Sequence, residues 1–282
     1  MYQNIFLDIK KMKMHIWDDT KGHLEVPFRK YAYVKDGNGQ HVSLYGDRLK
    51  KVTNYDKDDP TLHESDVPPT TRFLVDNYGD SDEMSVGHRI MFFDIEVEVT
   101  DGFPDVQKAQ NVITSIALYD CLTEKYFTYC FDPEKRIKSY TKDDEVVEFY
   151  DTEYEMLNKF FQKYLEIRPT IVSGWNSEFF DIPYLYNRAV RVLGPEVANL
   201  LSPISQVLYS EYKKKHTIAG VSSLDYLQLY RQFTFGQKSS YRLDYIGEVE
   251  VGMKKVDYEG TLNDLYDNDL QTFIDYNIRD CL

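Results

Sequence analysis

The sequence predicts a mixed α/β (α+β) fold in two parts, a small β-rich N-terminal domain at residues 1–87 and a larger domain at residues 88–282. Three observations support this division. A chain of 282 residues is long enough for two domains, since one domain runs to roughly 100–200 residues. The first part alternates strand-like runs with turns. From residue 90 on, strand-like and helical patterns occur together, which is typical of a mixed sheet with helices against it.

The composition is that of a folded protein with a large excess of acids. Hydrophobic residues make up 42% of the chain and aromatic residues 15%, which is ample for packed cores. The net charge of −14 argues against a protein that coats polyanions in general. It leaves nucleic acid open as a partner, because a nuclease that holds cations needs clustered acids and local basic patches can still bind phosphates.

The cysteines and the hydropathy pattern narrow the class further. Three cysteines without CxxC spacing suit a reducing compartment and no structural zinc, and the six histidines form no HExxH pattern. Neither a signal peptide nor a run of about 20 apolar residues is visible. We therefore expect a soluble, cytoplasmic (intracellular) protein, located in the host cell if its source is viral.

The elements of the N-terminal part are short. NIFLDI, KMHIWDD and YAYVKDGNGQHVSLYG are strand-like runs, and the DGNG sequence at 36–39 is a strong hairpin-turn signal. Residues 54–87 are rich in loop-forming residues. We expect the domain boundary near residues 84–89.

The larger part begins with three strand-like runs between residues 90 and 131, which predict a meander. The segment DTEYEMLNKFFQKYLEIR predicts a helix, because apolar residues recur every fourth position at Met156, Phe160 and Tyr164. A buried-type strand, PTIVSGWN, and a second helix, IPYLYNRAVRVLG, follow.

One strand-like run, MFFDIEVEVT at 91–100, separates acids from apolar residues. Its period of two places Asp94, Glu96 and Glu98 on one face and the apolar residues on the other. Taken alone, the run favours a solvated face on an edge strand. The alternative is a metal site, with Glu98 as a solvated acid at the end of the strand.

A second acid stands in IVSGWNSEFFDIPYLYNR at 171–188. The strand ends at Gly174, and Asp181 follows at a helix start, with Pro183 near the first helical position. Asp181 could cap the helix, since aspartate is a preferred N-cap. It could also point into a site at the carboxyl end of the strand, where ligands of open α/β sheets bind.

A third pattern lies in LQTFIDYNIRDCL at 270–282. Tyr276 and Asp280 are one turn apart on one face of an expected helix. An amphipathic helix with a polar shoulder would look the same.

Together the three patterns resemble the DEDD superfamily of 3′→5′ exonucleases, in the subclass with a tyrosine four residues before the last aspartate. More narrowly, they resemble the proofreading domain of a family B DNA polymerase. FFDIEV is similar to the first motif of that family, SGWNSEFFDIPYLYNR to the second and YNIRD to the third. VSSLDYLQLYRQFTFGQKSSYRLDYIGE is similar to the phage-type polymerases. RKYAYVKD and DVPPTTRFLVD resemble the family's N-terminal domain more loosely.

The resemblance implies an RNase H-like fold and a catalytic set of Asp94, Glu96, Asp181, Tyr276 and Asp280. It implies two ions, Mg²⁺ or Mn²⁺, with the four carboxylates as ligands. Asp94 would bridge both ions, Glu96 and Asp280 would help hold the ion that binds the attacking water, and Asp181 would support the second. Tyr276 would orient the water.

The resemblance also suggests DNA contacts. Asn176, Phe179 and Phe180 belong to the second motif, and the two aromatic rings are candidates to pack on bases, whereas Phe93 is expected to face the core. Lys255 falls near the place of a family lysine at the scissile phosphate.

Residues 207–221, VLYSEYKKKHTIAGV, predict a hairpin with Lys213, Lys214 and Lys215 in its basic middle. It could be a surface hairpin with a lysine tip that resists edge pairing. By the resemblance, it would help pass the primer strand from the polymerase site to the exonuclease site, and we favour this second interpretation.

The predicted function is thus a metal-dependent 3′→5′ exonuclease that hydrolyses the 3′-terminal phosphodiester of single-stranded or frayed primer DNA. Two alternatives remain, a non-catalytic DNA-binding or scaffolding half of a split polymerase and a stand-alone RNA-trimming DEDD exonuclease. The sequence shows no palm, fingers or thumb segment, so we expect the polymerase domains elsewhere, in cis or on a second chain.

Overall fold

The computed structural model describes residues 1–100, 102–253 and 256–281. The chain divides into two compact units, Met1–Gly87 and His88–Leu282. We call them the N-terminal unit and the exonuclease unit, and each is described by itself. None of the helices in the described part of the chain is both long and apolar enough to cross a membrane.

The N-terminal unit holds two small antiparallel sheets and one helix. The first sheet contains β1 (Tyr2–Asp8), β2 (Lys13–Asp18) and β3 (Gly22–Pro27). The second has the order β5-β6-β4-β7, and its strands are β4 (Ala32–Lys35), β5 (His41–Val42), β6 (Arg48–Val52) and β7 (Leu62–His63). A turn is present at 36–39, because the Gly39 amide donates to the Asp36 carbonyl oxygen. The predicted hairpin is wrong, because β4 pairs with β6 and β7 whereas β5 pairs with β6.

The helix of this unit, α1 (Pro69–Tyr78), lies in a stretch whose composition indicated only loops. Pro69 occupies its first turn, where a missing N–H costs no helical hydrogen bond. Phe73 and Tyr78 pack against the buried side chains of Met14, Ile16 and Phe28. The helix therefore completes the small core of the unit.

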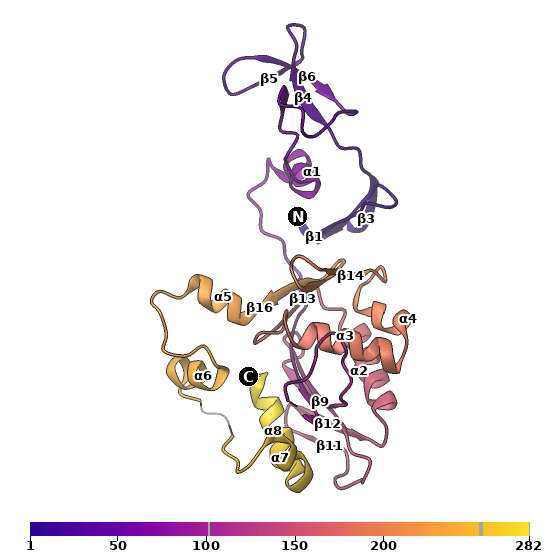
Figure 1. Cartoon of the computed structure of the whole chain (residues 1–282), viewed down its shortest axis with the longest axis vertical. Helices are drawn as coiled ribbons and strands as arrows, with labels where there is room; N and C mark the ends of the chain where they lie inside the picture. The colour runs from indigo at the N-terminus through magenta and orange to yellow at the C-terminus, as the bar shows by residue number, and fades with distance from the viewer. Residues whose placement is uncertain (101, 254–255, 282) are drawn as a thin grey trace. The chain divides into compact units, whose positions relative to one another are not determined.

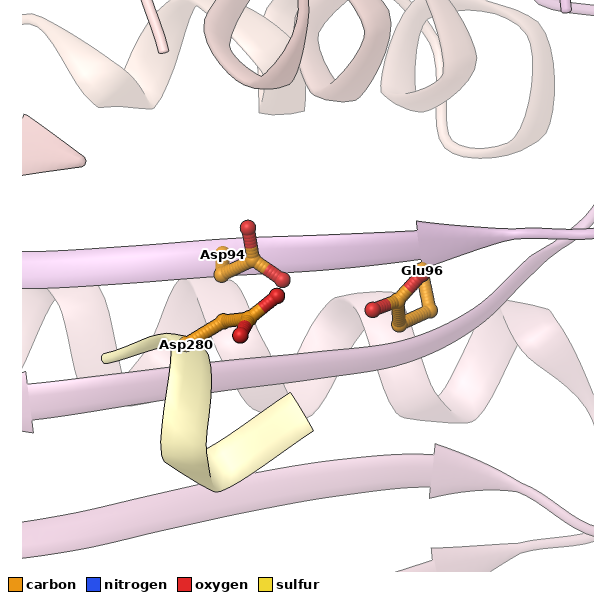
Figure 2. A group of neighbouring side chains, drawn as sticks. All are labelled: Asp94, Glu96 and Asp280. Carbon is orange, nitrogen blue, oxygen red and sulfur yellow. The ribbon is translucent and has the colours of Figure 1, made fainter. Parts of the chain in front are cut away.

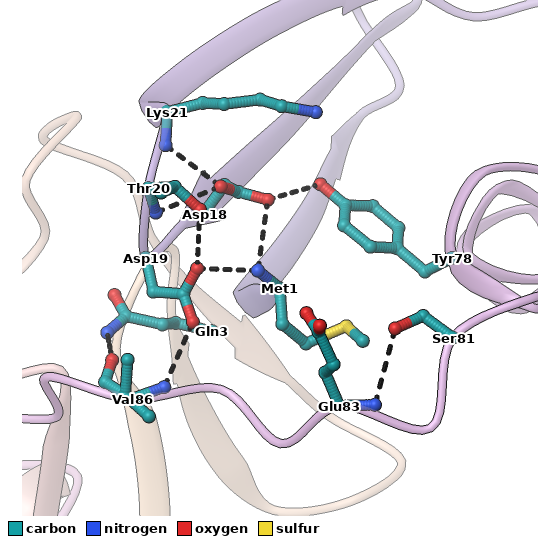
Figure 3. Close-up of polar contacts among 10 residues, drawn as sticks. All are labelled: Met1, Gln3, Asp18, Asp19, Thr20, Lys21, Tyr78, Ser81, Glu83 and Val86. Atoms are coloured by element: carbon teal, nitrogen blue, oxygen red, sulfur yellow. Dashed lines mark hydrogen bonds and ion pairs between the residues drawn. The ribbon is translucent and has the colours of Figure 1, made fainter.

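A polar network, which we call the Asp18 network, ties this unit together (Figure 3). The Asp18 carboxylate accepts hydrogen bonds from the Thr20 amide at 3.0 Å, the Lys21 amide at 2.9 Å and the Tyr78 hydroxyl at 3.0 Å. The neighbouring Asp19 accepts from the Val86 amide at 3.0 Å. Two carboxylates thus connect the β2–β3 turn to α1 and to the segment that follows it.

The exonuclease unit is built on a mixed seven-stranded sheet of order β11-β12-β10-β9-β8-β13-β16 (Figure 1). Its strands are β8 (Ile90–Val97), β9 (Ile113–Asp120), β10 (Lys125–Phe131), β11 (Tyr140–Lys142), β12 (Glu145–Tyr150), β13 (Ile171–Gly174) and β16 (Ser222–Asp225). The predicted meander is confirmed, because β8, β9 and β10 pair antiparallel. β13 then pairs parallel with β8 on its other side.

Helices cover both faces of this sheet. The helices of this unit are α2 (Glu153–Ile167), α3 (Asp181–Val192), α4 (Pro195–Ala198), α5 (Tyr226–Phe233), α6 (Leu243–Val251), α7 (Leu262–Asn268) and α8 (Leu270–Asp280), with a 3₁₀ turn at Asn199–Leu201. Side chains of α2 and α3 share one core with Phe93 and Ile95, whereas α7 and α8 share another with Cys130 and Val147. A separate hairpin, β14 (Val207–Ser210) and β15 (Lys215–Ile218), confirms the hairpin predicted at 207–221.

The helix α2 shows why the sequence pattern was informative. Thr152 caps it by accepting from the Glu155 amide, and Met156, Phe160 and Tyr164 are all buried as their spacing predicted. They pack on the face of the sheet that also buries Phe93. The opposite face of β8 is therefore the one that carries the acids.

Candidate active site

The strand β8 presents Asp94 and Glu96 on the face opposite the α2–α3 core. Phe93 and Ile95 are buried in that core, so alternation along the strand directs the two acids to the other face. The interpretation of a solvated edge strand is wrong, because β8 lies between β9 and β13 in the middle of the sheet. Glu98 follows the last residue of β8 and is not one of the three residues grouped below.

The helix α8 brings Asp280 to these two acids. Side-chain oxygens of Asp94, Glu96 and Asp280 all lie within 4.8 Å of one another, and we call this group the carboxylate cluster. Figure 2 shows the carboxylates of Asp94 and Asp280 facing each other, with Glu96 pointing toward them. Each residue is partly or largely buried, so the three like charges are only partly screened by water.

Asp181 stands beside this cluster at the first residue of α3. Its side chain is only 3% exposed, and its Oδ1 atom accepts a hydrogen bond from the Ile95 amide at 3.2 Å. No side chain caps α3, so the interpretation of Asp181 as an N-cap is wrong. Burial raises the pKa of Asp181 to about 7, and the nearby charges of Asp225 and Asp280 add to this increase. The fourth predicted carboxylate thus shares the field of the cluster without belonging to its three-residue group.

Tyr276 lies one turn before Asp280 on α8, as predicted. Its half-buried ring packs edge-to-face on Tyr258, with 5.6 Å between the ring centroids. The ring also packs against the core that α7 and α8 share with Cys130 and Val147. Of the two residues, only Asp280 belongs to the carboxylate cluster.

An open pocket of about 460 Å³ gives access to the cluster. Asp94 and Asp280 line it together with Trp175, Asn176 and Arg242. The pocket combines carboxylate oxygens, an aromatic ring and a guanidinium group, which suits a ligand that carries both a base and a phosphate.

Residues 78–246 match the family model described as DNA polymerase family B, exonuclease domain. The chain belongs to this family. The matched range contains Asp94, Glu96 and Asp181, whereas Tyr276 and Asp280 lie beyond it and join the exonuclease domain through the position of α8.

Relatives of the exonuclease domain include phage and archaeal polymerases. The DNA-directed DNA polymerase of Escherichia phage RB69 is 33% identical over 68% of this chain and 24% of its own length. That of Enterobacteria phage T4 is 32% identical over 66% of this chain and 24% of its own length. DNA polymerase 1 of Saccharolobus solfataricus is 29% identical over 78% of this chain and 26% of its own length. The chain thus spans about a quarter of the length of the relatives that it matches.

The aromatic residues suggested for base contacts fall into two classes. Phe93 is buried as expected, whereas Phe179 is 43% exposed in the turn before α3. Phe180 is partly buried against Tyr184, and on its other side it contacts Phe103, which is 81% exposed. Phe103 was not predicted from the sequence, although the Gly-Phe-Pro sequence at 102–104, after the acidic strand, indicates a loop that can expose a ring.

The lysines suggested for DNA contacts are placed unequally. Lys213 and Lys214 lie in the turn of the β14–β15 hairpin, and Lys214 pairs with Glu211 at 3.1 Å. Lys215 pairs with Glu178 at 2.8 Å and so ties the hairpin to the loop of the second motif. Lys255 lies outside the described residues.

Asp225 is a residue that the sequence reasoning missed. Its buried carboxylate accepts from the amides of Asn176 and Glu178, each at 3.2 Å, and also caps α5. Asn176 has a φ of 65°, a left-handed conformation that asparagine tolerates better than most residues. Asp225 therefore holds the loop that leads to Asp181. The signal was an aspartate directly before the amphipathic run YLQLYRQF.

Proposed function

We propose that the chain is a metal-dependent 3′→5′ exonuclease that removes the 3′-terminal nucleotide of single-stranded or frayed primer DNA, as the proofreading part of a family B DNA polymerase. The carboxylate cluster is the observation that carries this proposal. Three acids within 4.8 Å repel one another unless a cation lies among them. Burial is the main cause of the raised pKa of Asp181, and the charge of Asp280 in the cluster adds to it.

The donor set fits hard divalent cations. The three grouped residues offer only carboxylate oxygens, which are the ligands that Mg²⁺ and Mn²⁺ prefer. Asp94, Glu96, Asp181 and Asp280 would hold two such ions. When bound, a pair of ions supplies an activated water and neutralises charge on the leaving oxygen.

The residues of the chain would divide the remaining work. Asp94 would contribute to both cation positions, while Glu96 and Asp280 would help hold the cation that activates the water and Asp181 would support the other. Tyr276 would donate or accept a hydrogen bond that orients this water. The exposed rings of Phe179 and Phe103 would pack on the bases of the frayed strand, since every base offers a stacking face.

The short coverage of the relatives bears on the partner. Because the chain spans about a quarter of their length, we infer that it acts with polymerase domains in cis or on a second chain. The basic hairpin β14–β15, tied to the second-motif loop through Lys215, would guide the primer strand between the two sites.

Digestion of 5′-labelled single-stranded DNA and RNA of matched sequence tests the proposal. We expect a ladder of DNA products shortened one nucleotide at a time from the 3′ end with Mg²⁺ or Mn²⁺, and none with chelator. Faster cleavage of RNA would favour a stand-alone RNA-trimming enzyme. Binding without cleavage of either strand would favour a scaffolding half of a split polymerase.

A further inference from the structure

Asn277 is a fully buried amide on the face of α8 that packs against the sheet. Its exposed fraction is 0%, and it lies between Tyr276 and Asp280 on the same helix. A buried amide destabilises the fold unless its hydrogen bonds are made. The partners of Asn277 are therefore informative about its role.

Both halves of this amide have specific partners. The Nδ2 atom donates to Asp94 Oδ2 at 2.9 Å, and the Oδ1 atom accepts from the Ser115 hydroxyl at 2.7 Å. An ionised carboxylate only accepts, so the amide must turn its NH₂ group to Asp94 and its oxygen to Ser115. The chemistry of the two neighbours thus fixes the orientation of the side chain.

Ser115 anchors this arrangement from the neighbouring strand. It lies on β9 directly opposite Glu96, and its exposed fraction is also 0%. Ala117 lies opposite Asp94 in the same way, and the Cys281 thiol just after α8 donates to its carbonyl oxygen at 3.4 Å. Small side chains at both positions let α8 approach the strand pair closely.

We propose that Asn277 is a positioning residue that sets the Asp94 carboxylate for divalent cations and fixes α8, with Tyr276 and Asp280, on β8 and β9. The hydrogen bond from Nδ2 stops rotation of the carboxylate and so fixes the directions in which its oxygens face a cation. Asn277 has no exposed surface and donates to Asp94, so it acts through that carboxylate. This inference rests on the proposed metal-dependent function and deepens it.

Calorimetric titration of the 282-residue chain with Mn²⁺ alone measures metal binding and so tests this role independently of turnover. We expect Asn277→Ala to weaken the Kd for Mn²⁺ by about tenfold or more, as loss of residues that orient ligands commonly does. Ser115→Ala should weaken it by a smaller factor, because the amide keeps Asp94 but loses its own anchor. In an Asp94→Ala background, adding Asn277→Ala should cause a smaller further loss, because only the placement of Asp280 on α8 is then affected.

Asn187→Ala provides a matched control. Asn187 is another asparagine on a helix, and it is partly buried. Its Nδ2 atom donates to the Val106 carbonyl oxygen at 2.9 Å. We expect this variant to lower the melting temperature and to keep the wild-type Kd. If the role of Asn277 is purely structural, Asn277→Ala should likewise lower the melting temperature and keep the wild-type Kd.

Each outcome decides the matter. A folded Asn277→Ala protein with wild-type Kd overturns the inference while leaving the exonuclease proposal intact. If Asn277→Ala does not fold, Ser115→Ala decides in its place, and a wild-type Kd there overturns the inference. A wild-type chain that binds no Mn²⁺ overturns both proposals together.

Discussion

The two units of the chain each hold a group of acids, and the groups are built in opposite ways. In the N-terminal unit, Asp18 accepts from two amides and a hydroxyl, and these hydrogen bonds hold its pKa well below the usual range (Figure 3). In the exonuclease unit, Asp94, Glu96 and Asp280 face one another, and burial raises the pKa of the adjacent Asp181 (Figure 2). The first carboxylate is surrounded by hydrogen-bond donors, whereas the second group places three carboxylates within 4.8 Å of one another.

This difference would separate a structural acid from the acids that we propose to bind cations. Donors from the turn and from α1 make Asp18 a structural tie. Crowded carboxylates in a partly buried site raise the free energy of the folded state until a cation binds. Asp18 and Asp181 are both almost unexposed, so the neighbours of each carboxylate are what distinguish them.

The largest expected effect is on catalysis. Asp94→Ala should slow removal of the 3′-terminal nucleotide by roughly three powers of ten, which corresponds to about 4 kcal/mol of barrier. Asp18→Ala should leave the rate per folded molecule unchanged. Single-turnover digestion of single-stranded DNA by both variants measures the contrast, and a similar loss in both would remove the distinction drawn between the two groups.

The second effect is on stability. Divalent ions should stabilise the exonuclease unit by about 2.7 kcal/mol at one hundred times the Kd, because they bind the folded state preferentially. The chain has two tryptophans, Trp17 in the N-terminal unit and Trp175 beside the site, so a Trp17→Phe protein reports on the exonuclease unit in a urea titration.

In the same background, the double variant Asp94→Ala, Asp280→Ala should lose the stabilisation by ions. It should also be more stable than its parent in chelator, since two repelling charges are gone. An undiminished shift in the double variant would show that the ions bind elsewhere.

The third effect is a dependence on pH in the N-terminal unit. Hydrogen bonds from the Lys21 and Thr20 amides lower the pKa of Asp18, so the folded state binds its proton less firmly than the unfolded chain. The contribution of Asp18 is therefore complete above the unfolded pKa of about 4 and is lost as the pH falls through the folded pKa.

Asp18→Asn should lower the free energy of unfolding by about 2 kcal/mol at pH 7, and the difference from wild type should shrink in acid. Trp17 fluorescence in a Trp175→Phe background measures it. If the difference in the free energy of unfolding stays constant from neutral pH into strong acid, the ionised Asp18 carboxylate does not stabilise the unit.

The smallest expected effect concerns Tyr276. Tyr276→Phe should slow turnover by about tenfold, or about 1.4 kcal/mol, because only the hydrogen bond that orients the water is lost. The Kd for Mn²⁺ should stay at its wild-type value, since every carboxylate remains. If the variant instead weakens Mn²⁺ binding as much as it slows cleavage, Tyr276 supports α8 rather than the water.

Patterns that repeat within one element were predictable from the sequence. The period of β8 placed Asp94 and Glu96 on one face, and the spacing in α8 placed Tyr276 and Asp280 on one face. The apolar spacing of α2 and the turn at 36–39 were likewise local signals.

Features that depend on distant partners were not predictable in this way. Asp181 had the pattern of a helix cap, but its Oδ1 atom accepts a hydrogen bond from the Ile95 amide of β8. The central place of β8 follows from pairing with two strands, of which β13 comes much later in the chain. At the start of α1, Pro68 before the helix and the Pro-Thr-Thr sequence of its first turn hid a helix that tertiary packing stabilises.

The hydrogen bond between Asn277 and Asp94 joins residues 183 positions apart, and this separation has a consequence for protein synthesis. A ribosome makes β8 early and α8 late, and domains generally begin to fold from the N-terminal side as they emerge. The N-terminal unit and most of the sheet are therefore available for folding while Asp280 is still to be added. A chain released before α8 is complete has no means to assemble the carboxylate cluster, so premature termination yields a protein without the cluster rather than an uncontrolled nuclease.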